Sequence, residues 1–440
     1  MSRQIHLAGF LLAGPVVHSH AVWRHPDTLG DYLDPEYYAR SARVLEEGLF
    51  DLLFFADRFA IGDQLGGSRE LALRYGAQDA TRLDPLPILS YLVGQTRRLG
   101  LGVTRSTTYY EPAHVARSLA TLDHLSRGRA AWNIVTSMND SEGRLFGKDR
   151  HLEHDLRYDR ADEFVEVALK LWSSWAPGAL KLDRERGILA DPAEVRDVAH
   201  QGEWFKVEGP LNIPRSPQGR PLLIQAGSSG RGRRFGARWA EAIFSIHGNL
   251  PAMRAFRDDV RRQVIAQGRA ADQCKVLTAV MPFIGGSEAE ARASATATTP
   301  WRVRRSAWRP CPRSSTSISP PSPGYPPGSD RRTARDAAGG GREAALAGRR
   351  AEPRRTRAKL RQQRARAAAG RHRRADCRAA GGDLQRRRLR RLRDLPGYLP
   401  GSFAEFAESV VPHLQRLGLY RRAYEGATLR EHLGLGPLEA

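Results

Sequence analysis

The sequence has few cysteines and no long apolar run. Three cysteines occur in 440 residues, and no pair has the spacing of a metal site or of a disulfide framework. Such scarcity is typical of the reducing cytoplasm, where we expect the chain to reside. No stretch approaches the roughly 20 apolar residues of a membrane-spanning helix, and the first 20 residues lack a signal-peptide core. These absences predict a cytoplasmic protein without membrane contact or metal.

Several catalytic motifs are also missing. The sequence has no HExxH motif, no Walker A motif ending in GK[ST], and no GxGxxG after its first apolar segment. No Ser-His-Asp or Cys-His arrangement follows from the residue spacing. Hydrolase and metalloenzyme chemistry therefore have little support.

Net positive charge is almost entirely confined to one block. Residues 301–400 contain 27 Arg and one Lys against seven acidic residues, a balance of +21, but only one Val and one Ile. The whole chain carries +22, so the other 340 residues carry +1. An ordinary amphipathic sequence resumes at 402–435. The chain thus resembles a near-neutral globular enzyme interrupted by an aberrant segment at about 298–395.

Three explanations of the Arg-rich block compete. A nucleic-acid-binding arm would use clustered Arg, but the block lacks interleaved aromatic residues for base stacking. A natural disordered linker would have this composition too. The third explanation, which we favour, is a double frameshift: codons for LRRLRDL (389–395), read one base later, can encode Cys-Ala-Gly-Phe-Val-Ile-Ser, which resembles a buried strand. We then expect a disordered or irregular block, a lost last strand, no nucleic-acid partner and impaired activity.

Short apolar segments alternate with amphipathic helical patterns in the rest of the chain. The segments are almost continuously apolar, as strands buried on both faces of a parallel sheet are. Seven of them lie at 4–14, 49–57, 99–107, 130–137, 221–227, 240–247 and 275–286. Helical patterns lie at 35–49, 114–126 and 160–175.

This alternation predicts an α/β fold, namely a TIM (β/α)8 barrel whose eighth strand is not visible. An open doubly wound sheet is the alternative. We expect residues 1–297 to supply strands 1–7 and 396–440 to form a C-terminal helical segment of the same domain. A long excursion at 138–220 is expected to cover the mouth of the barrel, at the carboxyl ends of its strands.

Polar residues gather where the predicted strands end. Asp57 ends one strand, and Thr104, Asn133 and Thr136 lie near the ends of the next two. Carboxyl ends of barrel strands face the active site, so these side chains are expected to converge. Each of them alone also has an ordinary structural explanation, such as strand propensity or helix capping.

Two further segments have the residues of a ligand site. Ser228 and Ser229 follow the strand PLLIQAG and precede an Arg-rich helix, where hydroxyls and helix N–H groups can bind phosphate. A flexible Gly/Ser turn is the alternative. In HLEHDLRYDRADEF (151–164), His154 and Tyr158 share a helix face at i, i+4 and would offer donors to a planar ligand. A solvated helix entry is the alternative.

These motifs, in this order, resemble the bacterial luciferase-like flavin monooxygenases. The branch is the one with nitrilotriacetate monooxygenase component A and dibenzothiophene-sulfone monooxygenase. The resemblance covers 1–295 and about 396–436, and it rests on these segments: LFFADRF (53–59), 104–139 with WNIVTS, 157–175, PLLIQAGSSGRGRRFGARWAEAIF (221–244) and 398–435.

The resemblance implies an FMN-dependent two-component monooxygenase with a TIM barrel. A separate NAD(P)H-dependent flavin reductase would supply reduced FMN, and O2 would form a C4a-peroxyflavin that inserts one oxygen atom into a small organic substrate. Carried over residue by residue, the flavin contacts would be Asp57, Thr104, His154, Tyr158 and Ser229, with Ser228 and Ser229 at the phosphate and Asn133 and Thr136 as further candidates. The resemblance also implies a homo-oligomer. It assigns no catalytic acid or base.

Two other functions stay open at this point. A luciferase-like oxidoreductase that uses a deazaflavin would have a similar framework, although the WNIVTS and AGSSGRG segments favour FMN. An Arg-rich nucleic-acid-binding protein is the other alternative.

Overall fold

The structure is a computed structural model that describes residues 4–15, 23, 32–63, 69–76, 80–297 and 401–438. By their contacts, the described residues before and after the Arg-rich block belong to one compact unit. The block itself lies outside the described residues, and with it lie the predictions of an irregular segment, a frameshift and a lost strand. Those predictions and the domain boundaries at 298 and 395 therefore stay predictions.

A parallel sheet of seven strands forms the centre of the molecule. Each neighbouring pair of strands is parallel, in the order β1-β2-β3-β4-β9-β10-β11. The strands are β1 (Ala8–Leu12), β2 (Leu52–Ala56), β3 (Gly100–Ser106), β4 (Ala130–Val135), β9 (Leu222–Gln225), β10 (Ala242–Ser245) and β11 (Lys275–Thr278). All seven predicted strands are confirmed, and so is the parallel α/β class. Closure into an eight-stranded barrel stays a prediction.

The sheet is strongly curved. Phe10 of β1 stacks on Phe244 of β10 with ring centroids 5.5 Å apart. Phe54 of β2 contacts both rings edge-on, at 5.1 and 5.4 Å. Since β2, β3, β4 and β9 separate β1 from β10 in the sheet order, this contact requires the sheet to curl around an interior.

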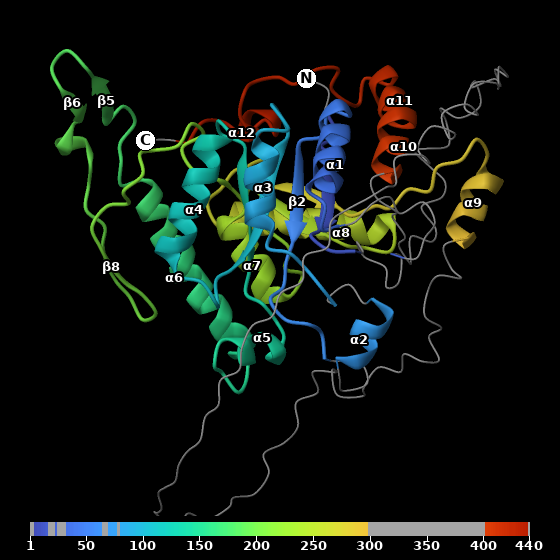
Figure 1. The fold of residues 1–440 in the computed structure, drawn as a ribbon, viewed down its shortest axis with the longest axis horizontal. Helices are drawn as coiled ribbons and strands as arrows, with labels where there is room; N and C mark the ends of the chain where they lie inside the picture. The colour runs from blue at the N-terminus through green and yellow to red at the C-terminus, as the bar shows by residue number, and fades with distance from the viewer. Residues whose placement is uncertain are drawn as a thin grey trace, which may run out of the picture. The chain divides into compact units, whose positions relative to one another are not determined.

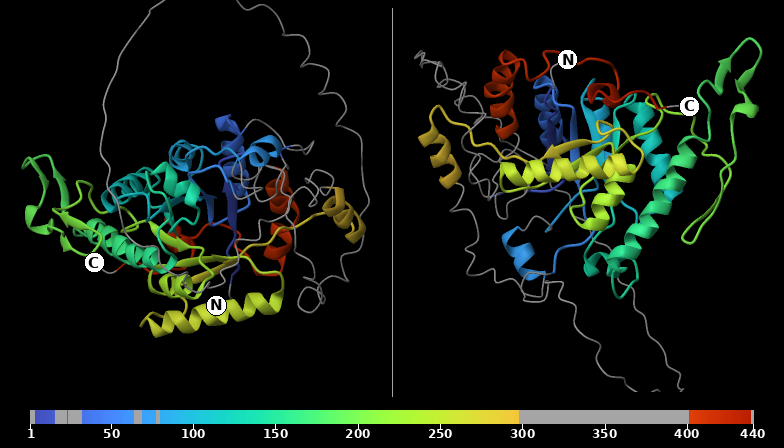
Figure 2. Two further views of the ribbon diagram at one scale, coloured as in Figure 1. Left: turned by 90° about the horizontal axis from the view of Figure 1, so that it is seen from below. Right: turned by 180° about the vertical axis from the view of Figure 1, so that it is seen from behind.

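Helices cover the outer face of the sheet (Figures 1 and 2). Outward strand residues such as Phe55 and Trp132 are buried with helix residues such as Leu119 and Phe164. The main helices are α1 (Pro35–Glu47), α3 (Pro85–Val93), α4 (Pro112–Leu125), α6 (His154–Trp172), α7 (Gly230–Trp239) and α8 (Leu250–Ala266), with shorter α2 (Glu70–Tyr75), α5 (Asp140–Leu145) and α9 (Glu288–Ala297). The helices predicted at 35–49, 114–126 and 160–175 correspond to α1, α4 and α6.

The segment after the Arg-rich block packs at the amino ends of the strands. It forms α10 (Gly401–Ser409), α11 (Val411–Arg416) and α12 (Leu429–His432). Leu429 and Leu433 are fully buried and belong to the apolar cluster inside the sheet. The Leu429 backbone N–H donates to the carbonyl oxygen of Gly128, two residues before β4 begins. The segment therefore closes the end of the sheet opposite the mouth.

The excursion at 138–220 differs from its prediction. Only its first part lies at the mouth: Glu142 of α5 accepts a hydrogen bond from Ser137, at the end of β4. The later part forms two antiparallel hairpins, β5 (Leu180–Asp183) with β6 (Ile188–Ala190) and β7 (Ala199–Gln201) with β8 (Lys206–Glu208). These hairpins follow α6, whose Glu163 accepts the N–H groups of Trp204 and Phe205.

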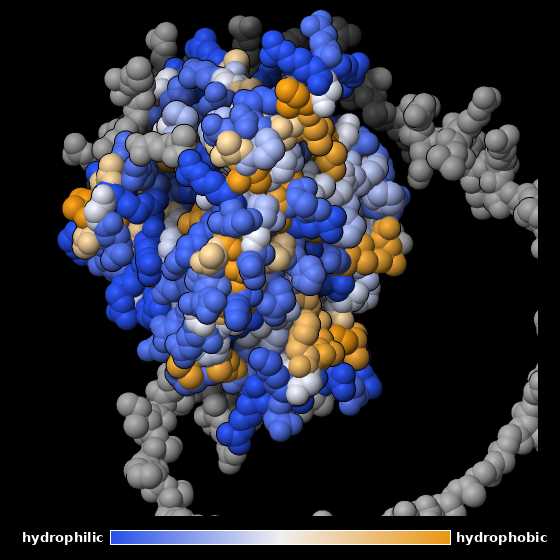
Figure 3. Space-filling model, turned by 90° about the vertical axis from the view of Figure 1, so that its left-hand side faces the viewer, coloured by the Kyte–Doolittle hydropathy of each residue, from blue (hydrophilic) through white to orange (hydrophobic). Residues whose placement is uncertain are grey.

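The excursion returns to the sheet at its amino end. Gln218 donates to the carbonyl of Ala130, the first residue of β4, at 2.8 Å. The expectation that all of 138–220 covers the mouth was therefore wrong for β5–β8. The face shown in Figure 3 is largely hydrophilic with small separate apolar patches. The β5–β6 hairpin has exposed apolar residues, which include Leu182 and Leu189.

Candidate active site

The predicted site residues come from four neighbouring strands and the segments that follow them. Asp57 directly follows β2, Thr104 lies in β3, Asn133 lies in β4, and Ser229 follows β9. Because these strands are all parallel and adjacent, their carboxyl ends lie at the same end of the sheet. Asp57 and Ser229 therefore lie at one end of the molecule, as the prediction requires.

Thr104 and Asn133 form a buried polar pair inside the sheet. The Thr104 hydroxyl donates to the carbonyl of Phe55 at 2.6 Å and accepts from the Asn133 amide at 2.8 Å. Both side chains are 3% exposed, and the Asn133 Oδ1 atom has no hydrogen-bond partner. A buried acceptor without a partner is costly, so this oxygen is suited to a donor supplied by a ligand.

Asp57 lies beside a buried arginine. Its Oδ1 accepts the N–H of Arg58 at 2.8 Å, and its Oδ2 lies 3.9 Å from Arg105 Nη1. Arg105 also donates to Asp84 at 2.7 Å. Burial raises the pKa of Asp57 to about 6, and the lowering effects of the Arg58 backbone N–H, Arg82 and Arg105 only partly offset it. Ionisation of the Asp57 carboxyl therefore costs free energy, and a hydrogen-bond donor of a ligand bound at the mouth would reduce that cost.

A second cluster joins Thr136, Tyr158 and Ser229. The hydroxyl of Tyr158, on α6, lies close to Ser229: a Cβ atom built at Gly232 would be 2.6 Å from this hydroxyl and 3.0 Å from Ser229 Oγ. Burial raises the pKa of Tyr158, and the nearby Ser229, Arg157 and Thr136 partly offset this rise. The backbone also passes close by at Gly227, where a Cβ atom would lie 2.9 Å from the hydroxyl. These glycines allow the α7 N-terminus to approach Tyr158 closely.

The N-terminus of α7 has the features of an anion site. Ser229 caps the helix by accepting the N–H of Gly232 at 3.0 Å. Ser228 and Ser229 are exposed, and the helix has ten residues, so its N–H groups and dipole face the mouth. Arg231 holds α7 to α6 through Asp159 and Asp162, at 2.8 and 2.5 Å.

His154 lies beside this second cluster. Its ring contacts Tyr158 edge-on at 5.2 Å, as the i, i+4 spacing predicted, while its Nδ1 lies 2.7 Å from Asp155. His154 is exposed. The predicted residues therefore fall into two groups: Thr104 with Asn133, near Asp57, and Thr136 with Tyr158, His154 and the two serines. Their roles toward a cofactor stay predictions.

Several polar groups near the mouth were missed by the sequence-based prediction. Tyr109 is hydrogen-bonded to His151 Nδ1 at 2.5 Å, and His151 Nε2 is buried without a partner. Burial and Arg157 lower the pKa of His151, so its ring is neutral near pH 7. Arg105 did leave a signal, because it is a charged residue inside an otherwise apolar strand. The Tyr109–His151 pair left none, because it depends on how two loops pack.

A large cavity lies elsewhere in the described part of the chain. Its volume is about 1320 Å³, and it lies between β1 and β11, lined by Ala8, Val276 and Phe406 among others. None of the eight predicted site residues lines it. The cavity is thus a separate feature, located between the two end strands of the sheet order.

The described residues lack two further kinds of feature. No described helix is both long and apolar enough to span a membrane. No group of three or more His, Cys, Asp or Glu side chains in the described ranges is arranged to hold a metal ion.

Comparison with known proteins identifies the family. The family profile described as luciferase-like monooxygenase matches residues 16–390. The dibenzothiophene-sulfone monooxygenase of Rhodococcus erythropolis (strain XP) is 43% identical over 98% of this chain and 97% of its own length. The nitrilotriacetate monooxygenase component A of Aminobacter aminovorans is 35% identical over 99% of this chain and 97% of its own.

Solved structures agree with these sequence matches. A long-chain alkane monooxygenase superimposes with a TM-score of 0.75 at 29% identity, covering 99% of this chain and 96% of its own. A riboflavin lyase with modified FMN superimposes with a TM-score of 0.66 at 36% identity, covering 68% of this chain and 67% of its own. The family resemblance predicted from the sequence motifs is confirmed: this chain belongs to the luciferase-like monooxygenase family.

Proposed function

We propose that this chain is the oxygenase component of a two-component flavin monooxygenase. It binds FMN that a separate NAD(P)H-dependent reductase has reduced, and it uses O2 to insert one oxygen atom into a small organic substrate. Family membership supports the reaction class, and a relative whose structure holds modified FMN supports the cofactor. The observation that carries the proposal is the N-terminus of α7, where Ser229 accepts the N–H of Gly232 at 3.0 Å and the Tyr158 hydroxyl lies beside the same turn.

The residues at the mouth fit FMN. Ser228, Ser229 and the N–H groups of the first turn of α7 supply hydrogen-bond donors for a phosphate, and the helix dipole favours its charge. Tyr158 adds a hydroxyl to the same cluster. Inside the sheet, the unpartnered Asn133 Oδ1 supplies an acceptor for a ring N–H. A phosphate-binding end and a polar ring-binding position therefore occur in one site.

Each group of side chains then has a distinct task. The α7 turn would hold the phosphate, while Thr104 and Asn133 would orient the ring at its polar edge. His154 and Asp57 would hold its remaining polar atoms. Phe10, Phe54 and Phe244 pack together inside the sheet and make part of the interior apolar, which limits access of water. When bound, the reduced flavin supplies the electrons that activate O2.

Flavin binding gives a direct test of this site. We expect the full chain to quench FMN fluorescence on titration, and Ser229→Ala to weaken binding at least tenfold, since a donor to the phosphate and the α7 cap are both lost. The matched control is Ser173→Ala, which removes a hydroxyl at the far end of α6 that bonds only helix carbonyls. Equal affinity of Ser229→Ala and the parent chain would refute the phosphate site.

The two-component reaction needs a second experiment. The chain should convert an organic sulfone or thioether to an oxygenated product only when FMN, NADH and an unrelated flavin reductase are all present. Turnover with NADH alone would contradict a separate reductase. Binding of a deazaflavin in preference to FMN would instead support the second enzyme class. A homo-oligomer is part of the proposal, and sedimentation of the purified chain tests it.

A further inference from the structure

We propose that Arg234 is the residue by which this site selects a phosphorylated flavin, because its guanidinium group is free to bind a phosphate at the start of α7. Arg234 lies in the second turn of α7, and Ser229 caps the first turn. The inference rests on the proposed FMN site and adds a specificity-determining residue to it. The chain would then bind FMN in preference to riboflavin, which has the same ring system and no phosphate.

The Arg234 side chain extends toward the first turn of α7. A Cβ atom built on Gly230, four residues earlier, would lie 3.9 Å from Arg234 Nη1 and would meet no other side chain within 4 Å outside its chain neighbours. Residues four apart share a helix face, and long helical side chains point toward the helix N-terminus. The guanidinium group therefore lies beside the turn that follows Ser229, with open space over Gly230.

Arg234 differs from the other arginines of α7 in having no carboxylate partner. The other three each lie within 4 Å of an aspartate, in the pairs Arg231–Asp162 at 2.5 Å, Arg233–Asp259 at 3.1 Å and Arg238–Asp162 at 3.7 Å. Among the described residues, no carboxylate lies within 4 Å of Arg234, whose side chain is exposed. A guanidinium group that no carboxylate neutralises is available to an anionic ligand.

Net positive charge outside the Arg-rich block is concentrated between the start of α7 and β11. Residues 230–275 contain nine Arg and one Lys against four acidic residues, a balance of +6. Since the 340 residues outside the block carry +1 in total, the remaining 294 carry −5. α8 packs against α7 on the outside of the sheet (Figure 2). The field of this layer therefore favours an anionic ligand at the start of α7 over a neutral one.

A phosphate monoester matches the groups that converge at this turn. It carries about 1.5 to 2 negative charges at pH 7 and three acceptor oxygens. A guanidinium group can donate two parallel N–H groups to two of these oxygens, and backbone N–H groups at the helix N-terminus can donate to the remaining oxygen. Arg234 thus contributes to binding only when the ligand has a phosphate group.

Titrations with FMN and with riboflavin test the inference on the full chain. At low salt, Arg234→Gln should weaken FMN binding about tenfold, since charge-assisted hydrogen bonds are lost, and should leave riboflavin binding unchanged. Flavin fluorescence measures both affinities. Because Arg234 is exposed and has no carboxylate partner among the described residues, the variant should keep the Tm of the parent chain. A loss of riboflavin affinity equal to the loss of FMN affinity would overturn the inference.

Arg233→Gln is the matched control. It removes the same charge one residue away, but the Arg233 guanidinium group is held by Asp259 at 3.1 Å. The FMN affinity of this variant should stay within about twofold of the parent value, because solvent and salt screen a charge that does not contact the ligand. Equal losses in the two variants would show that only the general field of α7 acts on FMN, and would refute a direct contact.

Salt and a conservative variant provide readouts that a purely structural role would not change. The FMN affinity of the parent chain should fall between about 0.01 and 1 M salt, as the Debye length falls from about 30 to 3 Å, and this dependence should be weaker in Arg234→Gln. Arg234→Lys should keep the salt dependence and lose part of the affinity, since an ammonium group lacks the planar fork. Identical salt dependence in Arg234→Gln and the parent chain would contradict the inference.

The same titrations separate this inference from the proposed function. A parent chain that binds neither flavin would overturn both. A parent chain that binds FMN, with Arg234→Gln binding it equally well, would leave the FMN site in place and remove Arg234 from it.

Discussion

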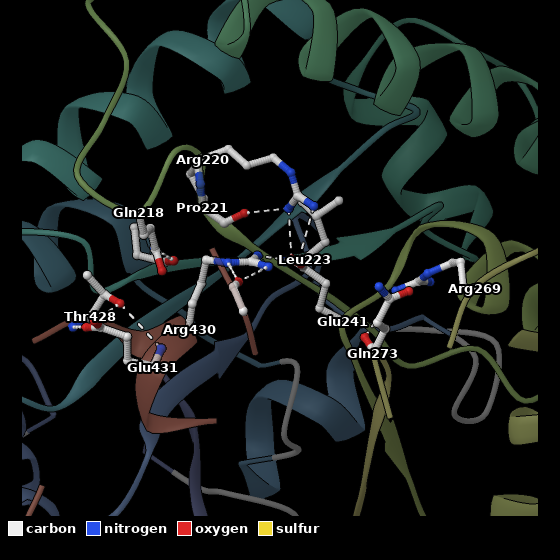
Figure 4. Close-up of polar contacts among 12 residues, drawn as sticks. Gln218, Arg220, Pro221, Leu223, Glu241, Arg269, Gln273, Thr428, Arg430 and Glu431 are labelled. Carbon is white, nitrogen blue, oxygen red and sulfur yellow. Dashed lines mark hydrogen bonds and ion pairs between the residues drawn. The ribbon is translucent and has the colours of Figure 1, made fainter. Parts of the chain in front are cut away.

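Arg430, near the end of the chain, donates a hydrogen bond to the buried carboxylate of Glu241, 189 positions earlier (Figure 4). Arg220 binds the same carboxylate from the other side, at 2.8 and 3.1 Å. Glu241 also accepts the N–H of Leu223 at 3.0 Å. The segment that follows the Arg-rich block is therefore tied to β9 and to the start of β10 through one acidic residue.

Removing this charge should destabilise the fold. Burial alone would raise the pKa of Glu241, but Arg220 and Arg430 lower it to about 2, so the residue is ionised at neutral pH. Glu241→Gln leaves two guanidinium groups without their anion, and we expect the free energy of unfolding to fall by about 3 kcal/mol. Urea denaturation of the variant and the parent chain at pH 7.5 measures this change in the free energy of unfolding.

A surface ion pair is the control for this variant. Glu166 pairs with Lys170 at 2.7 Å, with both side chains 43% exposed. Glu166→Gln should change stability by no more than about 0.5 kcal/mol. Similar losses for the two variants would mean that burial of the Glu241 carboxylate adds nothing.

Mild acid should weaken the docking of the C-terminal segment through His432. Burial and the nearby Arg421 lower the pKa of His432 to about 4, so the fold favours the neutral ring. In the unfolded chain the ring protonates below pH 6.5. Stability should therefore fall as the pH drops from about 6.5 to 4, by up to roughly 3 kcal/mol. His432→Asn should remove this dependence in urea titrations across that range, and a variant that keeps the full slope would contradict the assignment.

A pair of glycines in one helical turn tests the close approach at the proposed phosphate site. A Cβ at Gly232 would lie 2.6 Å from the Tyr158 hydroxyl and 3.0 Å from Ser229 Oγ, whereas one at Gly230 has only the Arg234 side chain within 4 Å, at 3.9 Å. We expect Gly232→Ala to weaken FMN binding more than tenfold, because it displaces Tyr158 or the α7 turn. Gly230→Ala should bind FMN like the parent chain in the same fluorescence titration. Comparable losses would show that any added methyl group disturbs α7.

The sheet could be predicted from sequence because its strands are buried on both faces. Segments such as LLFFA (52–56) are continuously apolar, which is the pattern of a parallel strand buried between two layers. The β5–β6 hairpin escaped prediction because its residues are mostly exposed and Leu182 adopts a positive φ of 50°. No periodicity marks a hairpin that has no buried face.

The candidate site was predictable in its residues but not in its contacts. Ser229 stands out because a Gly/Ser turn follows a strand and precedes a helix, which is a local pattern. Its closeness to Tyr158 depends on the packing of α7 against α6, fixed by Arg231 with Asp159 and Asp162. Such packing involves residues about 70 positions apart, and no local pattern encodes it.

Asp57 should show the opposite pH dependence to His432. Its pKa rises from an ordinary value of 3.8 to about 6, chiefly through burial, so the fold favours the neutral carboxyl. This contribution is complete below pH 3.8 and is lost as the pH rises through 6. Because the side chain is 13% exposed, solvent screening reduces the expected loss to about 1–2 kcal/mol.

Asp57→Asn should therefore be more stable than the parent chain at pH 8 and equally stable at pH 4. The pH ranges in which His432 and Asp57 change the stability overlap between pH 4 and 6. The effect of Asp57 is therefore measured as the difference between variant and parent urea titrations at each pH. The same variant should bind FMN more weakly if Asp57 holds a polar atom of the flavin. If Asp57 destabilises the fold but is needed for binding, Asp57→Asn will bind FMN more weakly and be more stable than the parent chain. A variant that loses both would instead identify Asp57 as a structural partner of Arg105 at the mouth.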